Sequence, residues 1–379
     1  MASVSALGRD SSEVWSAYNN CDHALTNIGS DYRSEYVGKL QEETMQAILA
    51  VRSSDPAYKD LDDSVLYGMH AARAAVRKAG WGPDVPFGVN LGSSRGATRL
   101  FEGYFKEFLE TGATSTQASP TTTLGNIASW VAQDLRAKGP DLSHSITCST
   151  ALHAVMNGVA WLRAGLVEKF LAGGSEAPLT DFTIAQMRAL KIYSRESGTY
   201  PCRALDLAKT NNSMVLGEGA AVACMEMGAR ENAVAWIEGI GYATEPLRHG
   251  ASLSSNASCL QDSMKMALGD IPPGEIDILV LHAPGTLKGD RAEYRAVQNV
   301  FGEMLPAMTT NKWKAGHTLG ASGTLSLEMA VMMLQHQRFV GVPYIEKAQQ
   351  PRRFRYAMVN AVGFGANAVS IVLRSPVEK

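Results

Sequence analysis

Short apolar runs alternate with longer segments of helical periodicity along this chain. Strands are expected over residues 87–94, 169–178, 217–227 and 277–285, with a strand end at 144–147 and two strands around a glycine-rich turn at 357–373. Helices are expected over residues 122–138, 149–165, 290–301 and 320–337. Strands that alternate with helices favour an α/β fold, in which helices cover the sheets.

The pattern of the first part of the chain returns in the second. A turn followed by a helix occurs near residue 148 and again near residue 317. No proline- or serine-rich linker separates the two parts, so they need not be independent domains. We predict one body of two similar halves, residues 1–235 and 236–379.

Composition narrows the class of protein. The chain has 379 residues, 45% of them hydrophobic, which suffices for a large core. The formal net charge is −2 and there is no long basic run, so nucleic acid is not expected as a partner. The N-terminal segment does not have the pattern of a signal peptide, and no apolar stretch approaches about 18 residues. These features predict a cytoplasmic protein without a membrane span.

One of five cysteines has a distinctive position. Cysteines 21, 148, 202, 224 and 259 form no metal-type cluster, so we expect reduced thiols and no metal site. Cys148, however, lies where a strand is expected to end and a helix to begin. Backbone N–H groups and the helix dipole would stabilise a thiolate there, and a thiolate can attack a thioester. The alternative is a small buried hydrophobic residue, which is our reading of the other four.

Five ordered motifs resemble those of β-ketoacyl-(acyl carrier protein) synthases. They are TCSTALHAVMNG (147–158), AGGSE (172–176), GEGAA (217–221), GHTLGASG (316–323) and NAVGFGANAVSIVL (360–373). The resemblance implies a thiolase-like fold with five αβαβα layers, two similar halves and a helix-covered mixed sheet in each. It also implies a dimer that acts on acyl carrier protein. No cofactor is implied, because phosphopantetheine arrives on the carrier.

The family reaction uses two histidines beside the cysteine. His317 stands in GHTLGASG and matches the second of them. For the first, aligning the Gly-Thr pair in LVLHAPGTLKGD would place Pro284 at the histidine position. Counting without a gap from Asp277 forward and from Asp290 back places His282 there instead. We adopt His282, whose N–H and that of His317 would stabilise a developing enolate.

Further residues match supporting positions of the family. Lys312 lies five residues before His317, where an electrostatic role is implied. Phe364 matches a gate on the acyl pocket, and its N–H with that of Cys148 would form the oxyanion hole. Thr286 matches a pantetheine-binding threonine.

Two departures from the family are visible. Pro284 replaces the first of the two family threonines, which helps to hold the pantetheine arm, whereas Thr286 matches the second. Ser326 replaces a glutamate, and Glu328 is no substitute, because two positions rotate a helical side chain by about 200°.

The resemblance therefore predicts acyl transfer to Cys148 followed by decarboxylative condensation with malonyl carrier protein, giving 3-oxoacyl carrier protein and CO2. The alternative is a non-catalytic or chain-length-determining subunit of a ketosynthase heterodimer, and the partner could be an identical or a similar chain. A thiolase would need a second reactive cysteine near the C-terminus, but the last one is Cys259.

The pathway and the docking surface are open at this stage. The pathway is fatty acid or polyketide biosynthesis, and HAPGTLKGD resembles synthases of aryl polyene and flexirubin pigments. A basic docking patch for the acidic carrier is suggested at Arg203, Lys209, Arg352 and Arg353.

Overall fold

The computed structural model describes residues 1–29, 35–82, 85–228, 230–246, 253–345 and 353–376. The strands of the first large sheet are β1 (Ala2–Ser5), β4 (Gly88–Gly92), β5 (Asp141–Leu142), β6 (Lys169–Glu176) and β7 (Gly219–Glu226). Those of the second are β8 (Trp236–Thr244), β9 (Ile278–Val280), β10 (Ala307–Thr309), β11 (Tyr356–Val362) and β12 (Asn367–Arg374). A small ribbon joins β2 (Thr26–Asn27) to β3 (Tyr36–Val37).

Helices follow most of the strands. In the first half they are α1 (Ser11–Tyr18), α2 (Glu42–Ser53), α3 (Asp63–Ala79), α4 (Thr98–Thr111), α5 (Ala118–Thr122), α6 (Asn126–Asp134), α7 (Thr150–Arg163) and α8 (Asp181–Ala189). In the second half they are α9 (Ser258–Leu268), α10 (Leu287–Phe301), α11 (Lys312–Ala315) and α12 (Ser322–His336). Single 3-10 turns occupy Pro56–Tyr58, Pro273–Glu275 and Leu319–Ala321.

The two large sheets share one topology. Their strand orders are β1-β7-β6-β4-β5 and β8-β12-β11-β9-β10. In each order the first two pairings are antiparallel and the last two are parallel. The strands therefore correspond one to one, with β4 matching β9 and β5 matching β10. The predicted likeness of the two halves holds at the level of topology.

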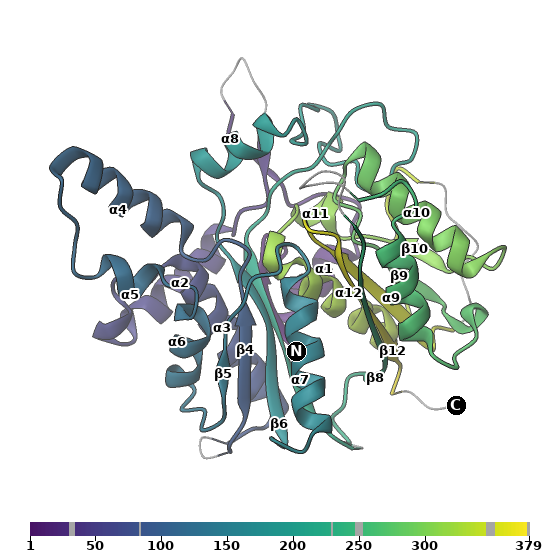
Figure 1. Ribbon diagram of the computed structural model, residues 1–379, viewed down its shortest axis with the longest axis horizontal. Helices are drawn as coiled ribbons and strands as arrows, with labels where there is room; N and C mark the ends of the chain where they lie inside the picture. Colours follow the sequence, from purple (N-terminus) through teal and green to yellow (C-terminus); the bar gives the residue numbers. More distant parts are fainter. Residues whose placement is uncertain (30–34, 83–84, 229, 247–252, 346–352, 377–379) are drawn as a thin grey trace.

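The layers follow from where apolar side chains are buried. α7 and α12 lie between the sheets, in a core that contains residues of β6, β7, β11 and β12 (Figure 1). α3 and α6 cover the outer face of the first sheet, and α9 and α10 cover the second. The result is the expected αβαβα stack, whose central helices begin at the ends of β5 and β10 and so bring these turns together.

Most of the expected helices and strands are present, but one expected strand end is absent. Residues 144–147 do not form a strand; β5 ends at Leu142, and only an isolated bridge joins Ile146 to Cys148. The reason is local, because Thr147 has a φ of +49°, outside the range of an extended strand. The helix expected at 122–138 is shorter, Asn126–Asp134. The predicted division after residue 235 falls just before β8.

Across the described part of the chain, no helix combines the length and the apolar character that a bilayer crossing requires.

Candidate active site

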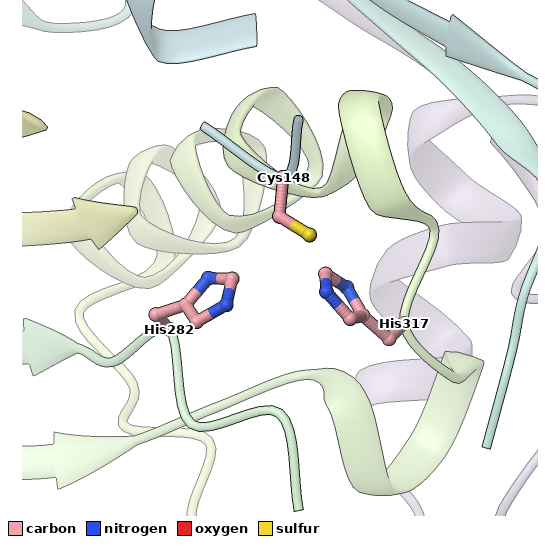
Figure 2. Close-up of side chains that lie close together, drawn as sticks. All are labelled: Cys148, His282 and His317. Carbon is pink, nitrogen blue, oxygen red and sulfur yellow. The ribbon is translucent and has the colours of Figure 1, made fainter. Parts of the chain in front are cut away.

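Three side chains from distant parts of the sequence converge between the sheets. The sulfur of Cys148 and ring nitrogens of His282 and His317 lie within 4.8 Å of one another, and all three residues are buried. The two imidazoles meet edge to face, with ring centroids 5.1 Å apart. Figure 2 shows both rings turned toward the sulfur. The gapless alignment, which selected His282 rather than Pro284, thus selected a residue that lies beside the cysteine.

The turn that carries Cys148 is fixed by hydroxyl groups on either side. Thr150 Oγ1 donates to Thr147 O at 2.6 Å and accepts from Ile146 N at 2.8 Å. Ser322 Oγ, at the start of α12, donates to Cys148 O at 3.4 Å. The nucleophile turn is therefore held by the first turn of α7 and by a helix of the other half.

Left-handed backbone recurs around the site. Thr147, Ala283, Leu319 and Ala366 all have positive φ, between 26° and 55°. Each lies within two residues of Cys148, His282, His317 or Phe364. Positive φ in non-glycine residues costs on the order of 1 kcal/mol or more and persists only where the surrounding structure enforces it. The fold thus holds four strained turns around one point.

The loop with Phe364 packs directly on the nucleophile turn. Thr147 Oγ1 donates to Phe364 O at 3.1 Å. A Cβ at Gly363 would lie 1.9 Å from Thr147 Oγ1 and 3.1 Å from Cys148 N, so only glycine permits this approach. The contact brings the backbone of Phe364 close to that of Cys148. The Phe364 ring is partly exposed and lines a cavity that also contains the three converging side chains.

Burial decides the protonation state of all three groups. It raises the pKa of the Cys148 thiol to about 12, while Lys312 and Arg95 act in the opposite direction. Desolvation therefore outweighs the nearby positive charges that favour a thiolate, and the thiol is neutral at rest. Burial also lowers the pKa of His317 to about 3 and that of His282 well below its usual value. A neutral thiol thus faces two neutral imidazoles, each with one N–H to donate.

Lys312 is buried beside this group, and the described part of the chain gives it no counter-ion. Its Nζ donates to Ser326 Oγ at 3.3 Å and Asn311 Oδ1 at 3.5 Å, and among the described residues no carboxylate oxygen lies within 4.0 Å of it. Burial lowers the pKa of Lys312 to about 8. Ser326 therefore stands where the family glutamate was expected. Glu328 is buried near Ser3 and the N-terminal amino group instead.

Two buried acids on α10 were not recognised from the sequence as part of the site. Glu293 accepts from the backbone N–H groups of His282 at 2.9 Å and Ala283 at 2.7 Å, and burial raises its pKa to about 7. Asp290 accepts from Gly285 N at 3.0 Å and pairs with Lys209. Both acids hold the loop that carries His282. In the sequence they could have been recognised as two acidic residues, three positions apart, on the buried face of an amphipathic helix.

A third acid joins the two halves. Glu176, at the end of β6, accepts from Ser93 Oγ at 2.7 Å, from Ser94 N at 2.7 Å and from Arg95 N at 3.0 Å. It also accepts from Gly320 N at 2.8 Å, three residues after His317. The AGGSE motif thus ends in a carboxylate that fixes the loop after β4 and the turn after His317.

The cavity gives the site an approach from outside. Its volume is about 880 Å³, and Thr286, Pro284 and Lys288 lie along one side of it. Thr286 caps α10, and its Oγ1 accepts from Gly289 N at 3.2 Å. Its hydroxyl hydrogen is left for another acceptor, whereas Pro284 has no hydrogen-bond donor to offer.

One residue of the suggested docking patch is buried, so its assignment to the patch is wrong. Lys209 is buried and pairs with Asp290 at 2.5 Å, because Asp290 needs a counter-charge in the interior. Arg203 pairs with Asp206 and lies over the Tyr344 ring. Arg353 is exposed, and Arg352 lies outside the described residues.

Sequence comparison identifies the family over most of the chain. Residues 2–230 match the model of the N-terminal domain of β-ketoacyl synthases, and residues 234–344 match that of the C-terminal domain. Nodulation protein E of Rhizobium meliloti is 28% identical over 337 residues, which cover 79% of each chain. The 3-oxoacyl-[acyl-carrier-protein] synthase 2 of Staphylococcus aureus is 24% identical in an alignment of length 406 that covers 99% of each chain.

Structural comparison confirms the thiolase-like fold of condensing enzymes. A β-ketoacyl synthase from Burkholderia phymatum superposes with a TM-score of 0.84 at 23% identity, covering 99% of this chain and 98% of that one. The ishigamide ketosynthase/chain length factor superposes with a TM-score of 0.86 at 19% identity, with the same coverage. The two matched domain models and the similarity to a 3-oxoacyl-[acyl-carrier-protein] synthase indicate a condensing acyltransferase. This chain belongs to the β-ketoacyl synthase family.

Proposed function

We propose that this chain is a 3-oxoacyl carrier protein synthase in which Cys148 holds the acyl group and His282 and His317 activate the malonyl group. One observation carries the proposal: a thiol and two neutral imidazoles lie within 4.8 Å of one another beside a cavity. A nucleophile and two N–H donors are what a decarboxylative condensation needs.

In the first half-reaction the Cys148 sulfur attacks the carbonyl carbon of an acyl thioester. Because the thiol is protonated at rest, its proton moves to a neighbouring imidazole during the attack and then to the pantetheine sulfur that leaves. The N–H groups of Cys148 and Phe364 receive the oxyanion, which the contact between their loops supports. The acyl group ends on Cys148.

In the second half-reaction a malonyl thioester enters, with Thr286 as a hydrogen-bond partner for its pantetheine arm. Loss of CO2 leaves an enolate, whose oxygen accepts hydrogen bonds from His282 and His317. The enolate carbon attacks the acyl-Cys148 carbonyl, and the thiolate that leaves recovers a proton. The positive charge of Lys312 helps to hold this negative charge while it forms.

The three converging residues would also offer three ligands to a metal ion. Metal-bound imidazoles usually donate from their second nitrogen to a carboxylate or carbonyl that orients them. Here Nδ1 of His282 and Nδ1 of His317 are both buried without a hydrogen-bond partner among the described residues. The orienting groups of a metal site are thus lacking. We propose that the site works with carrier-borne phosphopantetheine and without a metal.

A second subunit is part of this proposal. α4 extends away from the body of the molecule and exposes Phe101, Phe105, Phe108 and Leu109 (Figure 1). Leu142 is exposed on β5, at the edge of the first sheet. An exposed apolar cluster of this size on α4 indicates a protein interface. We infer a cytoplasmic dimer with an identical chain or, as in the ishigamide enzyme, with a chain length factor.

The test is intact-protein mass spectrometry with acyl carrier proteins that bear different acyl groups, followed by addition of malonyl carrier protein. We expect an acyl adduct on Cys148 that disappears as 3-oxoacyl carrier protein forms. Absence of an adduct with every donor, alone and after co-expression with a ketosynthase-like partner, would favour the chain-length-determining alternative.

A further inference from the structure

One wall of the cavity carries a guanidinium group. Arg95 follows β4, and its backbone N–H donates to Glu176 at 3.0 Å, which fixes its position. Its Nη1 donates to Gln186 Oε1 on α8 at 2.8 Å. The other residues that α8 and its C-terminal turn contribute to the cavity wall near Gln186 are apolar. They include Met187, Leu190 and Ile192.

The Arg95 guanidinium finds few hydrogen-bond acceptors within the described part of the chain. Of its five N–H donors, one has a partner among the described residues, namely the Gln186 amide oxygen. No carboxylate oxygen of that part of the chain lies within 4.0 Å of it. Water can solvate it while the cavity is open. A plain alkyl chain would displace that water and leave a desolvated cation without an acceptor, which is costly.

An acid on the same side of the cavity limits what charge the acyl chain can carry. Glu102, on the second turn of α4, lines the cavity and accepts from Thr180 Oγ1 at 2.8 Å. Its negative charge disfavours a carboxylate in the same space. A donor at Arg95 and an acceptor at Glu102 together suit a neutral oxygen function, a ketone or a hydroxyl.

We propose that Arg95 is a specificity-determining residue, which selects acyl chains bearing a ketone or hydroxyl oxygen over unsubstituted alkyl chains. The oxygen takes the place of water as the acceptor for the guanidinium. A site built to donate a hydrogen bond discriminates against an analogue that lacks the acceptor, because its donor is then left unpaired. The inference rests on the proposed function, since it assumes that the cavity receives the acyl group of Cys148.

The experiment compares four six-carbon acyl groups on carrier protein: hexanoyl, 3-oxohexanoyl, 5-oxohexanoyl and adipoyl. The two oxo groups place the oxygen near to and far from the thioester, and adipoyl adds a terminal carboxylate. Rates of Cys148 acylation are measured by intact-protein mass spectrometry for the wild type, Arg95→Leu and Arg99→Leu. Arg99 is the matched control, because it is an exposed arginine on α4 that does not line the cavity.

We expect the wild type to prefer one oxo group over hexanoyl by roughly 10- to 100-fold, the range of one hydrogen bond to a charged group. Arg95→Leu should abolish this preference, because the rates with the oxo groups fall relative to the rate with hexanoyl, and Arg99→Leu should leave the preference unchanged. A wild type that prefers hexanoyl, or an equal loss for all groups in Arg95→Leu, would overturn the proposal. So would a preference for adipoyl, which would assign a carboxylate instead.

A binding measurement separates this inference from the proposed function. Cys148→Ala cannot be acylated, so calorimetry with the same acyl groups as pantetheine thioesters reports the cavity alone. Tighter binding of an oxo thioester, lost in Cys148→Ala/Arg95→Leu, would support the role of Arg95 even if the wild type formed no adduct. Equal binding of hexanoyl and oxo thioesters would refute it even if condensation were observed.

Discussion

The two halves of this protein share a topology and differ in the chemistry at equivalent places. The turn between β5 and α7 carries Cys148, whereas the segment between β10 and α12 carries Lys312 and His317. The loop after β4 presents Arg95 to the cavity, and the loop after β9 presents His282. The sheets and central helices are alike because they form the core. The turns at the strand ends differ, and under the proposed function one half holds the acyl group while the other activates its partner.

The largest expected effect comes from removing Cys148, the proposed nucleophile of the first half. Cys148→Ala should abolish the acyl adduct and lower condensation by about 10⁴-fold or more, because no sulfur remains to carry the acyl group. Mass spectrometry and product formation check this. Cys202→Ala, at another buried thiol, is the control. An adduct that survives in Cys148→Ala but not in Cys202→Ala would reassign the nucleophile.

Removing a histidine of the second half should separate the two half-reactions. In His317→Ala and His282→Ala we expect decarboxylation of malonyl carrier protein to fall by about 10²- to 10³-fold, because an N–H donor to the enolate is lost. Acylation of Cys148 should fall much less, because the histidine that remains can still accept the thiol proton. Release of labelled CO2 and the rate of adduct formation measure the two steps. Equal losses in both steps would contradict the division of labour between the halves.

A smaller effect is expected where the second half contacts the nucleophile turn. Gly363→Ala would place a Cβ against Thr147 Oγ1 and push the Phe364 loop away from Cys148. Acylation should slow by roughly tenfold through the displaced oxyanion donor. Gly341→Ala, an ordinary contact near Phe339, serves as the control. Unchanged acylation with an intact fold would show that the Phe364 N–H takes no part.

The last prediction concerns stability rather than rate, and the expected change is an increase. Lys312 has a pKa of about 8 in the folded protein against an ordinary value of 10.5, so its burial disfavours folding whenever the amine is charged. Lys312→Met should therefore raise the free energy of unfolding at pH 7 by up to about 3 kcal/mol while lowering activity. Because the unfolded chain keeps its proton longer, this gain should shrink between pH 8 and 10.5.

Urea unfolding of Lys312→Met across that pH range measures the effect. Lys106→Met, at an exposed lysine of α4, is the control and should change little. A loss of stability at pH 7 in Lys312→Met would mean that the hydrogen bonds to Ser326 and Asn311 outweigh the burial of the charge.

The features of the fold and the site that depend on short stretches of sequence could be predicted from the sequence. Period and turn residues predicted the central helices. Motifs selected Cys148 and His317, counting from both flanks selected His282, and the structure brings these three side chains together. Contacts between distant segments were not predictable in this way. Glu176 bonds Gly320 across 144 residues, and Lys209 is buried because Asp290, 81 residues away, requires it. The protonation of Cys148 also escaped prediction, since it depends on how completely the fold excludes water.

The four left-handed turns around the site have a consequence for anyone who modifies this enzyme. Glycine at Thr147, Ala283, Leu319 or Ala366 would adopt the same backbone without steric penalty, and each exchange could stabilise the folded chain. Every such gain would lie next to a reacting group and would also widen the range of conformations open to it. Substitutions that stabilise the fold would therefore lie at positions where they also lower the turnover rate. Selection for heat resistance alone would favour variants with slower catalysis.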